Sequence, residues 1–308
     1  MMHAVEVKRR LGEEDIAEIA ALLSAVEAAD HHAALGEHQW LDLVHGGRTG
    51  SAGFVARRGG DRRLLGYAQL SRGQGNWQVE VAVHPAHRDQ GLGIELLRAA
   101  LAEVKLHGGG HVHFWVAQAG EADDAIAAEL GLNRGRELYQ MRRLLPLESG
   151  LDARADVLTL RAFRVGEDEK AWLALNNRAF AHHPEQGAWD AHTMAAREDQ
   201  AWFDPAGLLL AEHDGRLIGS CWTKVDTPED RGLGEIYVLA VDPELAGEGL
   251  GAALLAAGCR HLAGVGCDGV MLYVDASNEA ALHLYKSFGF AVDHHDRAYV
   301  TDVTPLGT

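Results

Sequence analysis

A glycine-rich turn in the second half of the chain has the composition of an anion site. The turn spans residues 246–251 (Ala-Gly-Glu-Gly-Leu-Gly), follows an alternating apolar run at 236–241 and precedes the helical pattern of residues 254–262. Asp242-Pro243 ends the run, because proline offers no N–H to a sheet ladder. Glycines let backbone N–H groups approach an anion, and a helix N-terminus adds partial positive charge. The turn lacks the spacing of a dinucleotide or ATP loop, so neither of those sites is favoured.

The segment after this helix makes the pattern more specific. Gly269–Val274 reads as a strand, and Asn278 is a good N-cap for a short helix that carries Tyr285 and ends at Gly289. Strand, Val-Asp-Pro, glycine turn, helix, strand and Asn-capped helix with a late tyrosine resemble the GNAT family of acetyl-CoA-dependent N-acyltransferases. This resemblance implies that the glycine turn holds the pyrophosphate of acetyl-CoA.

Bulk composition limits the partners. A length of 308 residues suggests two domains, and the net charge of −17 argues against a nucleic-acid or membrane-surface role. Three cysteines without C-x-x-C spacing and a first ten residues without an apolar stretch lead us to expect a cytoplasmic protein, and we expect a monomer. Paired histidines such as His182-His183 lack a carboxylate at ligand spacing, so we expect no metal site.

The glycine turn has a counterpart in the first half. Val83-His-Pro matches Val241-Asp-Pro, Gly91-Leu-Gly matches Gly249-Leu-Gly, and Gly131 matches Gly289; each pair is separated by 158 residues (241 − 83, 249 − 91, 289 − 131). Three pairs in one register indicate a tandem duplication. The resemblance implies an α/β fold of two tandem GNAT domains, each a mixed, mostly antiparallel central sheet flanked by helices. We expect domains at 1–145 and 155–308, joined by the irregular segment 141–156.

The two halves differ at the positions that could move protons. At the same separation Tyr285 falls on Ala127, Asn278 on Gly120 and Glu235 on Trp77. Glu80 lies at an odd distance from Trp77 and therefore on the opposite face of a regular strand, unless a bulge intervenes. We therefore expect the first domain to be cofactor-binding or structural, and the second to be catalytic.

Acetyl transfer to an amine needs a base for the ammonium and an acid for the departing thiolate. On their own, Glu235 reads as a solvent carboxylate and Tyr285 as a core aromatic. The GNAT resemblance implies instead that Glu235 is the base, acting directly or through water, and that Tyr285 is the general acid.

The resemblance also implies an acetyl-CoA site in the second half and a similar one in the first. The loop at 246–252 departs from the usual pattern, because Ala246 replaces a cation and Glu248 is acidic, whereas the first-half loop keeps Arg88. The second-half residues are Leu239, Ala240, Val241, Ala246, Gly247, Glu248, Gly249, Leu250, Gly251, Ala252, Asn278, Glu279, Ala280, Ala281, Leu282 and His283. Those of the first half are Val81, Ala82, Val83, Asp89, Gln90, Gly91, Leu92, Gly93 and Ile94.

The acceptor is suggested by a second resemblance. Residues 176–189, 201–205 and 221–225, with the tandem layout, are similar to the mycothiol synthase family. This implies acetylation of the cysteinyl amine of desacetylmycothiol, a thiol-bearing pseudo-disaccharide, with substrate contacts at Glu37, Glu185, Lys224, Glu235 and Tyr273. A tandem GNAT enzyme for another small amine or a protein N-terminus, and a non-catalytic acetyl-CoA-binding module, remain as alternatives.

Overall fold

The computed structural model describes residues 3–46, 49–59, 63–73, 75–181, 186–225 and 232–306. Its internal contacts divide the chain into two compact units. The first unit is Met1–Glu137 together with His295–Thr308, and the second is Leu138–His294. Both boundaries fall inside long strands, one at residues 133–144 and the other at residues 291–303.

The first unit is built on one mixed sheet. Its strands lie in the order β1 (His3–Lys8), β2 (Ala52–Arg58), β3 (Leu64–Arg72), β4 (Asn76–Val83), β5 (Gly110–Val116) and β12 (Ala291–Val303). All neighbours are antiparallel except β4 and β5, which run parallel. The helices are α1 (Glu13–Asp30), α2 (Glu37–His45), α3 (Leu92–Leu106) and α4 (Glu121–Glu129).

The second unit repeats this topology. Its strands lie in the order β7 (Leu160–Ala162), β8 (Leu208–His213), β9 (Arg216–Lys224), β10 (Leu233–Val241), β11 (Gly269–Asp275) and β6 (Asn133–Leu144). Only β10 and β11 are parallel. The helices are α5 (Ser149–Asp152), α6 (Glu169–Ala179), α7 (Ala191–Glu198), α8 (Leu250–Gly264) and α9 (Glu279–Ser287).

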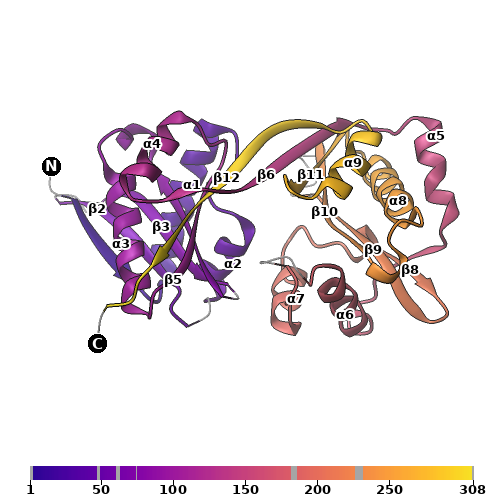
Figure 1. Cartoon of the computed structure of the whole chain (residues 1–308), viewed down its shortest axis with the longest axis horizontal. Coiled ribbons are helices and arrows are strands. Elements are labelled where there is room, and N and C mark those ends of the chain that lie inside the picture. The colour runs from indigo at the N-terminus through magenta and orange to yellow at the C-terminus, as the bar shows by residue number, and fades with distance from the viewer. Residues whose placement is uncertain are drawn as a thin grey trace. The chain divides into compact units, whose positions relative to one another are not determined.

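Each repeat gives its last strand to the other unit's sheet. Residues 138–144 of β6 pair with β11 of the second unit, and residues 297–303 of β12 pair with β5 of the first (Figure 1). The expected irregular join at 141–156 is therefore wrong at its start, because β6 runs on to Leu144. The Arg142-Arg143 pair hides the strand pattern in the sequence, although Met141 between the polar positions is fully buried.

Helices cover both faces of the first sheet. On one face α3 packs Leu92, Leu96 and Leu97 against Phe54 and Val79. On the other face α1 contributes the apolar side chains Ile19, Leu22 and Val26 to a separate cluster with Tyr67 and Ala82. The faces alternate along β4, as a regular strand requires.

The second sheet is covered in the same way. The cluster on one face contains Leu254 and Leu255 of α8, Tyr285 of α9 and Leu272 of β11. The cluster on the other face is rich in aromatic residues and includes Trp172 of α6, Met194 of α7, Trp222 of β9 and Val238 of β10. We call these the α8 face and the aromatic face.

The expected hairpin between β8 and β9 is confirmed. Its two turn residues, Asp214 and Gly215, have φ values of 49° and 73°. Two successive positive φ values are typical of the type I′ turn that matches the twist of paired strands.

The position of β6 in the second core can be tested by substitution. Met141→Ala should lower the free energy of unfolding by about 2–5 kcal/mol, because it leaves a cavity in the α8-face core. Denaturant unfolding followed by fluorescence measures this change, and hydrogen exchange should show faster opening of β11 than in the native chain. Leu144→Ala, at a side chain that is 79% exposed on the same strand, is the control and should change stability by less than about 0.5 kcal/mol. Equal effects of the two variants would contradict this packing.

Candidate active site

The parallel pairing of β10 and β11 stops after three residues of each strand. Their ladder covers Leu233–Glu235 opposite Gly269–Met271, whereas β10 continues to Val241 and β11 to Asp275. Beyond Glu235, β10 stays paired on its other edge with β9. The edge of β10 at residues 239–241 therefore faces away from β9 without a ladder to β11, and an extended acyl-amide chain can pair with such an edge as an added strand.

A β-bulge lies next to Glu235. Ile236 pairs with Thr223 and Val238 pairs with Trp222, so that Tyr237 is the extra residue of β10. Ile236 belongs to the α8-face core, while Tyr237 and Val238 both pack on the aromatic face. Because alternation holds before the bulge, Glu235 lies on the same face as Tyr237. The bulge thus places a carboxylate on the aromatic face at the end of the ladder.

Glu235 has a cation directly across the strand pair. It lies opposite Lys224 of β9 and beside Met271 of β11, which in turn lies opposite Arg142 of β6. Opposed residues of neighbouring strands point to the same face, so these four side chains form one row across the sheet. In this row the Glu235 carboxylate lies between two cationic side chains, Lys224 and Arg142.

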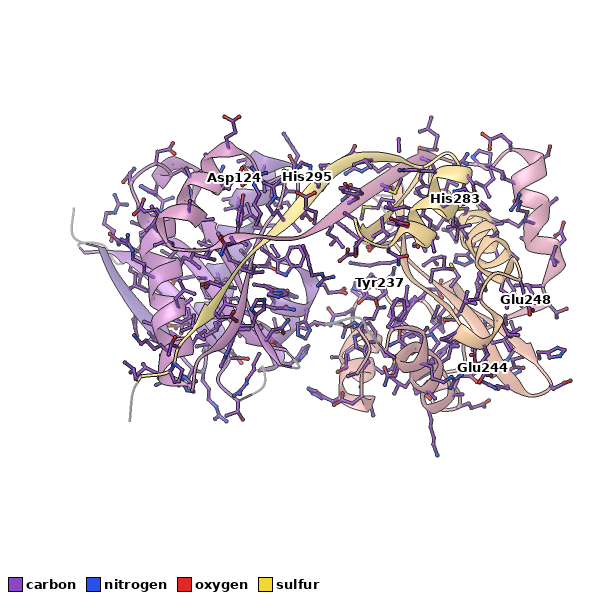
Figure 2. The ribbon with its side chains drawn as sticks, viewed as in Figure 1. Asp124, Tyr237, Glu244, Glu248, His283 and His295 are labelled. Carbon is purple, nitrogen blue, oxygen red and sulfur yellow. The ribbon has the colours of Figure 1, made fainter. Side chains whose placement is uncertain are left out.

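Aromatic side chains support the Lys224 end of that row. The Lys224 ammonium lies 5.0 Å from the ring centroid of Trp202 and 5.8 Å from that of Tyr237. The Tyr237 hydroxyl accepts a hydrogen bond of 2.7 Å from Nε of Arg197, and the Arg197 guanidinium stacks 3.9 Å from the Trp189 centroid. Tyr237 is labelled in Figure 2. The result is a polar and aromatic surface suited to a cationic, hydroxyl-rich ligand.

Tyr285 is placed differently from Glu235. Its ring is only 7% exposed in the α8-face core, 6.0 Å from the ring centroid of Phe290. Burial raises the pKa of the Tyr285 phenol above its ordinary value, so the phenol stays protonated at neutral pH. A buried, protonated phenol is able to act as a proton donor.

The two glycine-rich turns have the same backbone conformation. Gly247 and Gly249 have φ values of 89° and 84°, and their counterparts Asp89 and Gly91 have values of 60° and 78°. Gly249 and Gly91 are the N-caps of α8 and α3. Each turn therefore aims backbone donors and a helix N-terminus at one point, as expected for an anion site.

The arginine that favoured the first-half turn is already engaged. Both terminal nitrogens of Arg88 donate to the Asp30 carboxylate, at 2.7 and 2.6 Å. These hydrogen bonds lower the pKa of Asp30 and keep the pair charged. In the second unit the charges are reversed, because Arg178 of α6 donates to Asp242 before the turn at 2.9 Å. The first turn thus has less advantage in positive charge than its sequence suggests.

The remaining predicted positions are distributed as follows. Asn278 caps α9 through a 3.1 Å hydrogen bond from the Ala281 amide, and the first turn of that helix is exposed. Glu248 before α8 and His283 on α9 are labelled in Figure 2. Tyr273 is 41% exposed on β11, and Glu37 begins α2 of the first unit. Glu185 lies outside the described residues.

The structure changes which residue of the first unit corresponds to Glu235. Glu235 lies beside Met271, and at the corresponding place Gln78 lies beside His113. Gln78, not Trp77, is therefore the counterpart of Glu235, because the bulge adds one residue to β10 while the β3–β4 ladder runs without a register shift. Gln78 is neutral, buried and bonded by the Gln39 amide at 2.8 Å. Glu80 shares that face but accepts a 2.6 Å hydrogen bond from the Gly36 amide that precedes α2.

Two general searches complete the description. In the described ranges, no group of three His, Cys, Asp or Glu side chains is close enough to hold a metal ion. No helix in the same ranges combines the length and apolar character needed to cross a membrane.

The polar partners of the site were missed by reasoning from sequence alone. Tyr237 and Arg197 are hydrogen-bonded on the aromatic face, and Gln140 and Arg142 of β6 lie on the same side of the sheet as Glu235. The signal for β6 in the sequence is the alternation of Met141 with polar neighbours, and the predicted join at 141–156 overlaps only the end of this strand.

Comparisons with known proteins agree with this architecture. The model of the acetyltransferase (GNAT) family matches twice, at residues 16–131 and 170–290. A mycothiol acetyltransferase of Acidimicrobium ferrooxidans is 45% identical over 96% of both chains, and that of Thermobispora bispora is 43% identical over 93% of this chain and 95% of its own.

Solved structures show the same fold. A GCN5-related N-acetyltransferase from Sphaerobacter thermophilus has a TM-score of 0.69 at 24% identity, covering 98% of this chain and 96% of its own. A tandem GNAT protein from the clavulanic acid biosynthesis pathway also has a TM-score of 0.69, at 17% identity, covering 99% and 100%. With both halves matched by the family model and near-complete coverage of the curated relatives, the chain belongs to the mycothiol acetyltransferases, tandem members of the acetyltransferase (GNAT) family.

Proposed function

We propose that this N-acetyltransferase transfers the acetyl group of acetyl-CoA to the cysteinyl amine of desacetylmycothiol, giving mycothiol and CoA. The observation that carries the proposal is the identity of 45% over 96% of the chain with a mycothiol acetyltransferase. The aromatic face adds chemical support, because Glu235 suits an ammonium and Lys224 can donate to sugar hydroxyls. Glu37, Glu185 and Tyr273 are proposed as further substrate contacts.

The residues near the end of the β10–β11 ladder fit acetyl-CoA. Backbone groups of Leu239–Val241 would pair with the pantetheine arm, and the turn at 246–252 with the N-terminus of α8 would hold the pyrophosphate. Residues 278–283 at the start of α9 line the same arm. The turn itself supplies no cation, so backbone donors carry most of the phosphate binding.

The proposed reaction removes two protons from the ammonium nitrogen and gives one to the thiolate. Glu235 takes the first proton, directly or through water, and the freed amine attacks the thioester carbonyl. The new C–N bond forms as the C–S bond breaks, and the Tyr285 phenol gives its proton to the departing thiolate. The second nitrogen proton then leaves to solvent, and solvent returns a proton to the Tyr285 phenolate. Glu235 lies on the aromatic face and Tyr285 in the α8-face core, and both faces border the segment where β10 and β11 cease to pair.

We further propose that the second unit alone performs catalysis. The first unit has Gln78 and Ala127 at the places of Glu235 and Tyr285, so it lacks both proton-transfer groups, while its turn keeps the phosphate-binding conformation. It would bind acetyl-CoA through residues 81–83 and 89–94 or serve as structural support.

The chain is proposed to act as a cytoplasmic monomer. Its three cysteines are free and buried, which suits a reducing compartment. Light scattering of the purified chain should give a mass near 33.2 kDa. A mass of twice that value would contradict a monomer.

The acceptor is decided by a competition assay. Purified enzyme with acetyl-CoA is offered desacetylmycothiol, other small amines and peptides with free N-termini, and products are followed by mass spectrometry. Preferred acetylation of desacetylmycothiol supports the proposal. Preference for another amine would replace it with the alternative acetyltransferase function.

Removal of the proton-transfer groups should reduce turnover without loss of cofactor binding. Glu235→Gln and Tyr285→Phe should each lower kcat by on the order of 10²- to 10⁴-fold, because each removes one general acid or base. Stopped-flow or steady-state kinetics measures kcat, and calorimetry should show acetyl-CoA affinity within about threefold of the native value. Glu80→Gln, which keeps an acceptor for the Gly36 amide, is the control in the first unit. Full turnover in both variants would refute the assigned mechanism.

Matched glycine substitutions should separate the two turns. Gly249 and Gly91 both have positive φ, and an added Cβ would meet no atom within 4 Å at either site, so alanine tests backbone conformation alone. Gly249→Ala should raise the KM for acetyl-CoA by about tenfold, since a left-handed non-glycine residue costs about 1–2 kcal/mol. Gly91→Ala should leave that KM unchanged if only the second unit is catalytic. A reversed pattern would place catalysis in the first unit.

A further inference from the structure

One ion pair and two hydrogen bonds connect β12 to Tyr273. Asp293 forms an ion pair with Arg142, with 3.4 Å between Oδ2 and Nη2. Nε of Arg142 donates to Oε1 of Gln140 at 2.6 Å, and Nε2 of Gln140 donates to the Tyr273 hydroxyl at 2.7 Å. All four residues belong to the second unit.

The chemistry of arginine determines the direction of these hydrogen bonds. A guanidinium has only donors and does not lose its proton, so the Gln140 oxygen must face Arg142. The amide nitrogen of Gln140 must then face Tyr273, because Gln140 is only 4% exposed and its side chain is held at both ends. The Tyr273 oxygen is therefore an acceptor toward Gln140, and its own hydrogen points away from Gln140.

Tyr273 lies where that hydrogen can matter for the acceptor. It is two residues beyond Met271, the neighbour of Glu235, and alternation puts it on the same face as Glu235. Its side chain is 41% exposed, unlike the buried Gln140 behind it. An oxygen-rich ligand on this face would present acceptors to the phenol.

We propose that Gln140 and Arg142 are positioning residues of the acceptor site, which hold the Tyr273 hydroxyl as a hydrogen-bond donor to an oxygen of the sugar-bearing amine. The inference rests on the proposed function for the nature of that amine. It also means that the last strand of the first repeat supplies part of the acceptor site in the second unit.

The test is a reversal of hydrogen-bond direction in the full chain. Gln140→Glu is nearly isosteric and keeps an acceptor for Arg142, but the carboxylate accepts from Tyr273 and turns the phenol hydrogen inward. The KM for desacetylmycothiol should rise about three- to tenfold, the loss of one neutral hydrogen bond, while the KM for acetyl-CoA stays unchanged. Gln140→Glu in a Tyr273→Phe background should cause no further rise, since the two changes remove one interaction.

Further variants separate positioning from folding. Arg142→Lys keeps a cationic donor and should leave the KM for desacetylmycothiol close to the native value. Arg142→Met removes the donor and should raise that KM. Cysteamine, an amine without the sugar, is the matched substrate, and its KM should be unaffected by Gln140→Glu. Additive effects of Gln140→Glu and Tyr273→Phe, or equal effects on both amines, would overturn the assignment.

A readout without turnover keeps this inference distinct from the proposed function. The protein is labelled with carbon-13 at tyrosine Cζ, and the Tyr273 signal is assigned by its loss in Tyr273→Phe. This signal should shift in Gln140→Glu, because the phenol changes from acceptor to donor toward residue 140. If desacetylmycothiol is not acetylated but this shift occurs, the proposed substrate fails and the hydrogen-bond direction stands. An unchanged signal overturns the inference whatever the substrate.

Discussion

The limited ladder between β10 and β11 is the constraint on which the site depends. Parallel pairing ends at Glu235 and Met271, although both strands continue. A sheet that kept pairing would have used the backbone groups of residues 239–241 internally and separated its two faces completely. Because the ladder ends, the edge of β10 that faces away from β9 can receive an extended chain. Side chains of the α8 face and of the aromatic face both lie next to that edge. The proposed roles of Glu235 and Tyr285, which lie on opposite faces of the sheet, depend on this feature.

The strands that carry Glu235 and Gln78 differ by one extra residue and by one change of side chain. Tyr237 forms the bulge that turns Glu235 toward the aromatic face, and the same strand in the first unit is regular. The first unit has no bulge there, and at the same place it presents the neutral amide of Gln78, whose oxygen accepts a hydrogen bond from Gln39. The turns show the opposite behaviour, because their φ values agree in both units in spite of different residues. The duplication has therefore kept the backbone conformation of the glycine-rich turn and changed the strand beside it.

Local patterns in the sequence were sufficient for some features and not for others. The repeat, the Asn278 cap and the hairpin at Asp214-Gly215 follow from residue types with strong backbone preferences, and the structure contains each of them. The bulge could not be predicted, since register depends on the partner strand and the apolar alternation through Tyr237 appears unbroken. The end of β6, residues 141–144, falls inside the predicted join at 141–156, because its polar residues interrupt the apolar pattern of a strand. The hydrogen-bond directions at Gln140 and Arg142 also could not be predicted, because they depend on contacts between segments far apart in the chain.

The exchange of terminal strands limits how the two repeats can be separated. A cut between the repeats would yield two polypeptides, each holding a strand that completes the sheet of the other. Each sheet would then keep an open edge of N–H and C=O groups, which invites association with foreign strands. A duplicated gene with this arrangement does not return easily to a single copy by deletion, because the surviving copy would need to recover its own closing strand. Residues 138–144 are therefore encoded in the first repeat but make their contacts in the second unit.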